Sequence, residues 1–277
     1  MDILKSALFG IIEGVTEWLP ISSTGHLIIF NSLIPMNVSP EFYDLYEVVI
    51  QLGAILAVVL IFWNKIWPFG LSNNPISEKG ILKYCKKDKF ILWIKIAIAC
   101  IPAVIVGLLF DDWCNEHFYN PLCVALALIV VGVAFIVVEI LYKNKEPKIT
   151  KLSQIGFDTA LYIGLFQVLA AIFPGTSRSG ATIIGALILG VSRSVASEFT
   201  FFLSIPVMFG ASLLKIVKYG LAITLYEGLL IGVGCITAFV VSLFVIKLLM
   251  NYVRNHNFII FGVYRIILGI IVLLFVK

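Results

Sequence analysis

The sequence predicts an all-α integral membrane protein with six transmembrane helices plus two re-entrant helical hairpins, arranged as an inverted-topology repeat. The first observation is composition, since 61% of the 277 residues are hydrophobic and 13% are charged, against about 45–50% and about 25% in a soluble domain. The second is a series of apolar runs of about 20 residues, long enough to cross a ~30 Å hydrocarbon core. The third is that the order of segments in the first half of the chain recurs in the second half.

Six apolar segments are expected to cross the bilayer as helices. They are residues 45–63, 91–110, 119–142, 195–218, 226–250 and 259–276. A soluble protein cannot hide this much apolar surface, so bilayer lipid is the expected surrounding and the cell membrane is the expected location. Residues 1–277 are interpreted as a single membrane domain.

The loops between these segments predict their orientation. Loop 64–90 holds six lysines against two acidic residues, loop 143–152 holds four lysines against one glutamate, and segment 111–118 (DDWCNEHF) is acidic. The positive-inside rule places both basic loops in the cytoplasm and segment 111–118 outside, so the chain starts on the outer side. The net charge of +4 is modest. No nucleic-acid partner is therefore expected, and the formation of a homodimer is left open.

Two further segments do not fit a simple span. Residues 3–34 and 155–190 are each long enough for about one and a half crossings, and each contains a proline near its centre, Pro20 or Pro174. They are interpreted as re-entrant hairpins of two half-helices. A backbone broken in this way is tolerated where protein or a wet cavity surrounds it.

Each half of the chain then consists of one hairpin followed by three spans, with a first repeat over 1–142 and a second over 153–277. Residues 100–110 (CIPAVIVGLLF) match residues 235–245 (CITAFVVSLFV) at five of eleven positions. Because three is an odd number of crossings, the second repeat is upside down relative to the first. In such inverted repeats the site lies near mid-membrane, where the broken segments meet.

The first hairpin contains the motif IIEGVTEWLPISSTGHLII at positions 11–29. Glu13 and Glu17 share one face of a helix about one turn apart, and two carboxylates in an apolar segment repel each other unless a cation lies between them. Hard oxygen ligands suit Mg²⁺ or Ca²⁺, so both glutamates are candidate catalytic and metal-binding residues. The alternative, a pair of surface carboxylates on an interfacial helix, is disfavoured because ionisable groups within spans usually face a site.

Ser23 and His26 follow the proline within the same motif. A hydroxyl nucleophile needs a nearby base or acid, so the two residues are candidates for nucleophilic catalysis. Either Ser23 or a water attacks, with His26 transferring the proton, and Ser23 is the preferred nucleophile. Taken alone, His26 would be interpreted as a packing residue.

The second hairpin contains the motif PGTSRSGAT at positions 174–182. The planar guanidinium of Arg178 can form bidentate hydrogen bonds to phosphate oxygens. The N-terminus of the half-helix that begins here favours an anion. The alternative is a helix cap with an arginine that pairs with Glu13 or Glu17 without any ligand. The predicted substrate-binding residues are Gly175, Ser177, Arg178, Ser179, Thr182 and Gln51.

Glu47 and Glu198 open the spans that follow the two hairpins. Carboxylates at helix starts are common partners of the helix dipole, so a structural role is favoured over catalysis for both. Arg193 is the expected partner of Glu198.

In this order along the chain, EGVTEWLPISSTGH, QLGAILAVV, PGTSRSGAT, GVSR and ASEF resemble the undecaprenyl-diphosphate phosphatases of the bacitracin-resistance type. The resemblance implies a metal-dependent membrane hydrolase that removes the terminal phosphate of undecaprenyl diphosphate. Its product is the lipid carrier for cell-wall precursors. The resemblance also implies interlocking inverted repeats and a site open to the outer face. The functional residues that it implies are Glu13, Glu17, Ser23, His26, Ser177, Arg178 and Thr182.

Two other functions share some of these sequence features. A transporter or flippase of a polyprenyl phosphate would use the same inverted repeat with the same arginine and carboxylates, but it would not need Ser23 and His26. A type-2 phosphatidic acid phosphatase is echoed faintly by SSTGH and SRSG. However, its Lys/Arg-rich opening motif and its downstream His–Asp segment are absent from the sequence.

Overall fold

The computed structural model describes residues 1–71, 74–77, 80–220 and 222–275, and every regular element in these ranges is a helix. Glu78 and Lys79 of the predicted basic loop, and residue 276 of the last predicted span, lie outside the described residues. The elements are α1 (Asp2–Thr16), α2 (Ser23–Leu33), α3 (Pro40–Val49), α4 (Gln51–Ile61), α5 (Trp63–Ile66), η1 (Gly80–Tyr84), α6 (Lys87–Phe118), α7 (Pro121–Tyr142), η2 (Leu152–Gln154), α8 (Phe157–Ile172), α9 (Arg178–Ile188), α10 (Arg193–Tyr219), α11 (Leu225–Asn255) and α12 (Ile259–Phe275).

Within the described ranges, five helical segments are long and apolar enough to cross a membrane. They are Pro40–Ile61, Lys87–Phe110, Pro121–Tyr142, Arg193–Tyr219 and Leu225–Asn255. They overlap the first five predicted spans, and the last predicted span, 259–276, corresponds to the shorter apolar helix α12. Large apolar side chains such as Leu108, Val217 and Leu248 are exposed on these helices, as expected of surfaces that face lipid. The protein is therefore an all-α, multi-pass membrane protein.

Helix α6 ends later than the sequence suggests. The acidic segment 111–118, predicted as a connection outside the bilayer, continues α6 as far as Phe118. The turn comes at Asn120, whose side chain caps α7 by accepting the Cys123 amide at 2.9 Å. Pro121 then occupies the first turn of α7. Because a proline fits the first turn of a helix better than its interior, the helix boundary lies here and not at the acidic residues.

In each of the helix pairs α1–α2 and α8–α9, the chain after the second helix lies next to the start of the pair. At the ends of the first pair, Lys5 Nζ donates to the Pro35 carbonyl at 2.5 Å, and the Asn37 amide donates to Asp2 at 3.2 Å. At the ends of the second pair, the Ile149 amide donates to Gly190 at 3.1 Å, and the Ser192 amide donates to Ile149 at 2.8 Å. Each of these two segments thus consists of two helices separated by a break, with its two ends close together.

The two breaks share one local geometry. Ser22 (φ 73°) and Ser177 (φ 67°) are the non-glycine residues with positive φ in the described part of the chain. Each caps the helix that follows, with its hydroxyl accepting the amide of the glycine three positions later, Gly25 at 3.3 Å and Gly180 at 3.2 Å. Serine is a favoured N-cap residue, whereas its positive φ is uncommon and marks strain.

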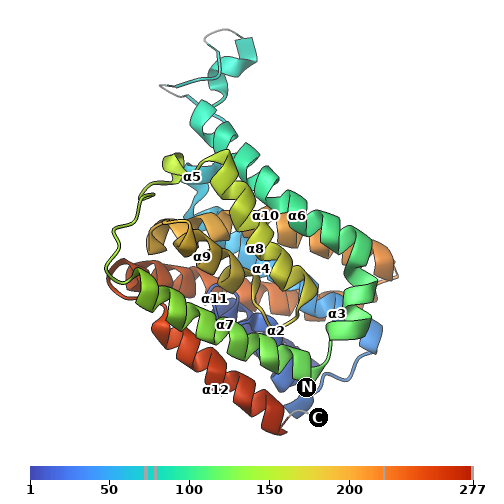
Figure 1. Ribbon diagram of the computed structural model, residues 1–277. Coiled ribbons are helices and arrows are strands. Elements are labelled where there is room, and N and C mark those ends of the chain that lie inside the picture. Colours follow the sequence, from blue (N-terminus) through green and yellow to red (C-terminus); the bar gives the residue numbers. More distant parts are fainter. Residues whose placement is uncertain (72–73, 78–79, 221, 276–277) are drawn as a thin grey trace.

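Each broken segment packs against a long helix of the other half of the chain. Helix α1 packs along α11. Helix α8 lies along α6, and α7 and α12 pack side by side (Figure 1). Glycines allow these close approaches. A Cβ atom on Gly132 would lie 2.7 Å from the Gly262 carbonyl oxygen, and a Cβ on Gly262 would lie 2.7 Å from that of Gly132. Close backbone contact at small residues is typical of helices packed within a membrane.

Candidate active site

Glu17 and Arg178 meet in the interior of the protein, although 161 positions separate them. Glu17 is the C-cap residue that follows α1, and Arg178 is the first residue of α9. Arg178 Nη2 donates to Glu17 Oε1 at 2.9 Å, and the two side chains are only 11% and 7% exposed. Arg178 Nη1 donates to the Thr200 carbonyl of α10 at 3.0 Å, which fixes the guanidinium from a second side. This contact joins the two motifs that the sequence predicts to form one site.

Ser23 lies on the other oxygen of the same carboxylate. Its hydroxyl donates to Glu17 Oε2 at 2.7 Å, and both residues are buried. The sequence predicts His26 as the proton-transfer partner of the hydroxyl. The structure instead places Glu17 against it. Glu17 therefore contacts the candidate nucleophile through one oxygen and the candidate phosphate-binding residue through the other.

His26 is half-buried in the first turn of α2 and bonded away from Ser23. Its Nδ1 donates to the Ser22 carbonyl at 2.7 Å. In a neutral ring, Nε2 then accepts the hydroxyl proton of Tyr264 at 2.7 Å. The rings of His26 and Tyr264 are also stacked, with centroids 5.6 Å apart. Tyr264 belongs to α12 and lies outside both sequence motifs, so it was not among the predicted site residues.

Glu13 is fully buried, and neither carboxylate oxygen has a hydrogen-bond partner among the described residues. It lies one helical turn from Glu17, and the charges of Glu17, Glu47 and Arg178 act on it. A buried carboxylate without a partner is strongly unfavourable. The site therefore calls for a proton or a cation next to Glu13.

The carboxylate oxygens at this site suit a hard cation that takes its other ligands from a bound substrate. Within the described residues, no group of three or more His, Cys, Asp or Glu side chains could hold a metal ion by itself. Mg²⁺ is commonly bound by one or two carboxylates together with phosphate oxygens of the substrate. Glu13 has both oxygens free for such a cation, whereas both oxygens of Glu17 are already engaged.

The hydroxyls of the second motif have different surroundings. Ser177 Oγ and Ser179 Oγ are 3.1 Å apart, and Ser179 Oγ also donates to the Glu17 carbonyl at 3.3 Å. Thr182 is fully buried, with its hydroxyl 2.9 Å from Thr200 Oγ1 and donating to the Arg178 carbonyl at 2.9 Å. The two serines thus lie beside the Glu17–Arg178 pair, whereas Thr182 holds α9 against α10.

Two predicted binding residues take other positions. Gly175 has a φ of +90°, and a Cβ atom on it would lie 2.6 Å from the Val124 carbonyl oxygen, so the backbone here lies directly against α7. Gln51 is half-buried at the start of α4. Among the described residues, the hydrogen bonds and ion pairs that involve Glu17 and Arg178 do not include Gln51.

Comparison with known proteins decides the family. A sequence model of the family described as "BacA: Bacitracin resistance protein BacA" matches residues 6–271. The chain belongs to the BacA family. The protein named "Undecaprenyl-diphosphatase 1" of Clostridium acetobutylicum is 54% identical over 275 residues, which cover 99% of this chain and 97% of that protein. Proteins named "Undecaprenyl-diphosphatase" from Desulfitobacterium hafniense and Enterococcus faecalis are 54% and 53% identical, over 99% of this chain and 96% and 97% of theirs.

Sequence reasoning missed Arg265, a buried residue of this BacA protein that lies next to the site. It lies in α12 and is fully buried. Its Nη1 donates to the Pro20 carbonyl at 3.1 Å, and its Nη2 donates to the carbonyls of Gly175 and Thr176, each at 2.8 Å. One guanidinium therefore ties the break of the first motif to that of the second. A single arginine within the apolar run 259–276 was the signal that could have found it, because charged residues inside spans rarely lack a role.

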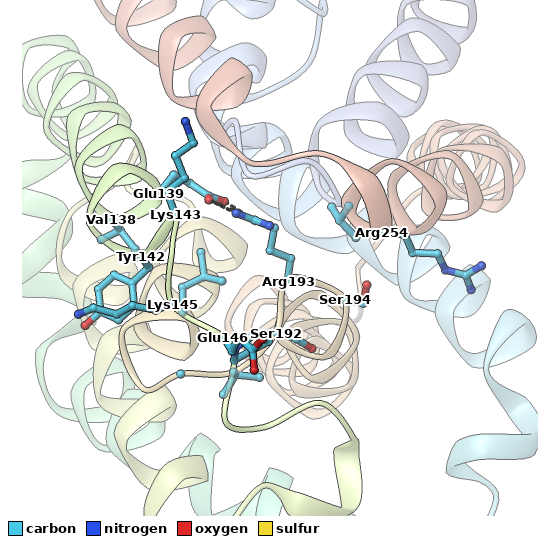
Figure 2. Close-up of a pocket in the computed structure, with 15 residues that line it drawn as sticks. Val138, Glu139, Tyr142, Lys143, Lys145, Glu146, Ser192, Arg193, Ser194 and Arg254 are labelled. Atoms are coloured by element: carbon cyan, nitrogen blue, oxygen red, sulfur yellow. Dashed lines mark hydrogen bonds and ion pairs between the residues drawn. The ribbon is translucent and has the colours of Figure 1, made fainter.

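Arg193 of this BacA protein forms an ion pair with a different residue from the one that the sequence predicts. Figure 2 shows Arg193 pointing at Glu139 of α7, with Arg193 Nη2 donating to Glu139 Oε2 at 2.5 Å. Glu198 instead accepts from Lys65 at 2.7 Å. The predicted pairing of Arg193 with Glu198 is therefore wrong. Glu139 also accepts the Phe258 amide at 2.9 Å, so it joins the start of α10 to the turn before α12.

Proposed function

We infer that this protein is an undecaprenyl-diphosphatase, which hydrolyses the terminal phosphate of undecaprenyl diphosphate to give undecaprenyl phosphate and inorganic phosphate. This reaction recycles the lipid carrier of cell-wall synthesis and confers bacitracin resistance. The observation that carries the inference is the buried Glu17–Arg178 contact, at 2.9 Å, in a chain that matches proteins of that name along nearly its full length. A guanidinium beside a carboxylate and a serine, inside apolar helices, suits a phosphate group on a lipid.

We propose the inverted repeat as the architecture of this site, with repeats over 1–142 and 153–277. The two breaks with positive-φ serines at Ser22 and Ser177 support it, as does the crossed packing of α1 on α11 and α8 on α6. In this arrangement α1–α2 and α8–α9 are re-entrant hairpins that enter from opposite faces, and α12 is the sixth span.

We propose that the site opens to the outer face. The basic loop 143–152 then lies in the cytoplasm, at the same end as the Arg193–Glu139 pair. The hairpin α1–α2 starts at the opposite end, where Tyr226 contacts Asp2 at 3.5 Å. The end that holds the start of α1 is assigned to the outer side by the positive-inside rule.

In the proposed mechanism the diphosphate lies at Arg178 and the N-terminus of α9, whose dipole favours an anion. Ser23 Oγ attacks the terminal phosphorus, its proton passes to Glu17 Oε2, and the bond from phosphorus to the bridging oxygen breaks to release undecaprenyl phosphate. Water then hydrolyses the phosphoserine, and His26 is assigned to proton transfer in this second step. Mg²⁺ or Ca²⁺ held by Glu13, with Glu17 nearby, would neutralise charge on the phosphoryl group in the transition state.

The activity is tested by the release of phosphate from undecaprenyl diphosphate in detergent micelles. We expect release that depends on a divalent cation and stops when a chelator is added. No gradient exists across a micelle, so a carrier that only moves the lipid would release nothing. Absence of phosphate release over a range of Mg²⁺ and Ca²⁺ concentrations would contradict the proposed function.

Replacement of the candidate nucleophile distinguishes the two routes of attack. Ser23→Ala should abolish the phosphoserine that forms when the wild type is quenched with acid during turnover, and should lower kcat by about 10²-fold or more. Mass spectrometry of the quenched protein locates the phosphate. Full activity in Ser23→Ala would assign the attack to water.

Replacement of the unpartnered carboxylate tests the cation site. Glu13→Gln keeps the size of the side chain but removes the charge, so the concentration of Mg²⁺ or Ca²⁺ that gives half-maximal activity should rise by about tenfold or more. Titration of phosphate release against each metal measures the shift, with Glu146→Gln in the basic loop as the control. A titration curve that coincides with that of the wild type would exclude Glu13 from the metal shell.

A further inference from the structure

An apolar groove of about 350 Å³ runs between α6, α8 and α10 and reaches Arg178. Small side chains shape much of it, and they include Ala103, Gly107, Ala170, Ala171, Gly210 and Ala211. Leu108 and Leu213, in the helices at its sides, are exposed as residues that face lipid are. The groove therefore connects the candidate phosphate-binding arginine with the lipid-facing surface.

Gln167 is the unexplained polar group in this groove. It lines the groove from α8 and is 2% exposed. Neither its Oε1 nor its Nε2 has a hydrogen-bond partner among the described residues, and the same holds for Nε of Arg178. A buried amide with both ends unpaired costs free energy and calls for an explanation. Here two groups with unpaired donors line one apolar groove, so the groove fits a ligand with a polar head and an apolar body.

We propose that this groove binds the first isoprene units of the prenyl diphosphate and that Gln167 contacts its diphosphate head beside Arg178. The proposal rests on the proposed function, because the head must reach Arg178. The volume lies at the lower end of the range of small-molecule pockets, ~300–1,000 Å³. The groove thus holds only the start of a long chain, and the remainder of the chain lies in the bilayer.

The chain offers matched glycines for a test. A Cβ atom on Gly107 or Gly210 would meet no other atom within 4 Å. Both glycines line the groove, so a larger side chain at either position is expected to narrow it. Gly228 and Gly232 of α11 are equally open and lie outside the groove. Phenylalanine is more favourable in a helix than glycine, so all four variants should fold.

Gly107→Phe and Gly210→Phe should each raise KM for farnesyl diphosphate and undecaprenyl diphosphate by about tenfold, the affinity that roughly two buried methylene groups contribute. Gly228→Phe and Gly232→Phe should leave KM unchanged. Equal KM values in all four variants would overturn the proposal. A wild type that releases no phosphate would overturn the proposed function instead, so the two failures are distinguishable.

Gln167→Leu separates a ligand contact from a packing defect. Removing an unpaired buried amide should leave the melting temperature unchanged or raise it, while KM for farnesyl diphosphate should rise about tenfold through the loss of a hydrogen bond to a charged group. A higher melting temperature with an unchanged KM would show that Gln167 is a buried amide without a ligand and would overturn its assignment.

Photolabelling identifies the occupant directly. A farnesyl diphosphate analogue with a diazirine on its terminal isoprene unit should label the peptides that contain residues 103–108 or 206–214, and excess undecaprenyl diphosphate should prevent the labelling. Equal protection by phosphatidylglycerol would make the groove a site for bilayer lipid and overturn the proposal. A change in oligomeric state in Gly107→Phe, but not in Gly232→Phe, would make it a contact between two copies and overturn it as well.

Discussion

Arg178→Ala should lower kcat/KM for undecaprenyl diphosphate by about 10²–10³-fold, because the loss of one preorganised donor to a developing charge has an effect of this size. The substitution also removes the partner of Glu17, whose carboxylate is 7% exposed and 2.9 Å from the guanidinium. A buried charge left without its partner is destabilising. Steady-state phosphate release should therefore be measured together with the melting temperature.

The size of this effect depends on the shape of the guanidinium and not only on its charge. Arg178→Lys keeps a positive charge but cannot bond Glu17, the Thr200 carbonyl and a phosphate from fixed directions, so most of the loss should persist. Arg254→Ala, an exposed arginine of α11, is the matched control and should retain wild-type activity. Substantial activity in Arg178→Ala would mean that the phosphate binds elsewhere.

Arg265→Met should destabilise the protein more than any of the other substitutions. It keeps an unbranched, flexible stem but removes the guanidinium, so the carbonyls of Pro20, Gly175 and Thr176 lose their donor. An unsatisfied buried acceptor costs ~1–3 kcal/mol, so the melting temperature in detergent should fall clearly. Because both breaks lose their common anchor, kcat should fall about 10²-fold or more, as expected when catalytic groups are displaced by about 1 Å.

Two further variants of α12 test this assignment. Arg265→Lys keeps the charge and can reach some of the three carbonyls, so it should recover part of the stability and part of kcat. Ile267→Met, at an exposed position of the same helix, should change neither quantity. If Arg265→Met has the melting temperature and kcat of the wild type, the two breaks are held in place without this arginine.

The sequence was sufficient to predict five of the apolar helices of membrane length, because these depend on local patterns. Apolar runs of membrane length identify helices wherever they fold. The Glu17–Arg178 contact could be expected because both motifs carry costly charges inside apolar segments, and such charges seek each other or a ligand. The pairing therefore followed from the energy of burial, without knowledge of how the helices pack.

The remaining features depend on packing between distant helices. Glu17 takes the position at Ser23 that was expected of His26, because the break around Ser22, with its φ of 73°, returns the chain to the end of α1. Arg193 pairs with Glu139 because α7 brings that carboxylate to the start of α10. The spacing of Arg193 and Glu198 along one helix does not indicate that Glu139 competes for Arg193.

The crossed packing of α1 on α11 and of α8 on α6 has a consequence for biosynthesis. During translation, the first hairpin emerges long before the residues that will cover it, and Glu17 has no arginine partner until position 178 has been made. An amino-terminal half released at residue 142 would carry exposed carboxylates and an uncovered helix face in the bilayer. The buried Glu17–Arg178 pair can therefore form only after α9 has been made, and α1 gains its packing partner only with α11.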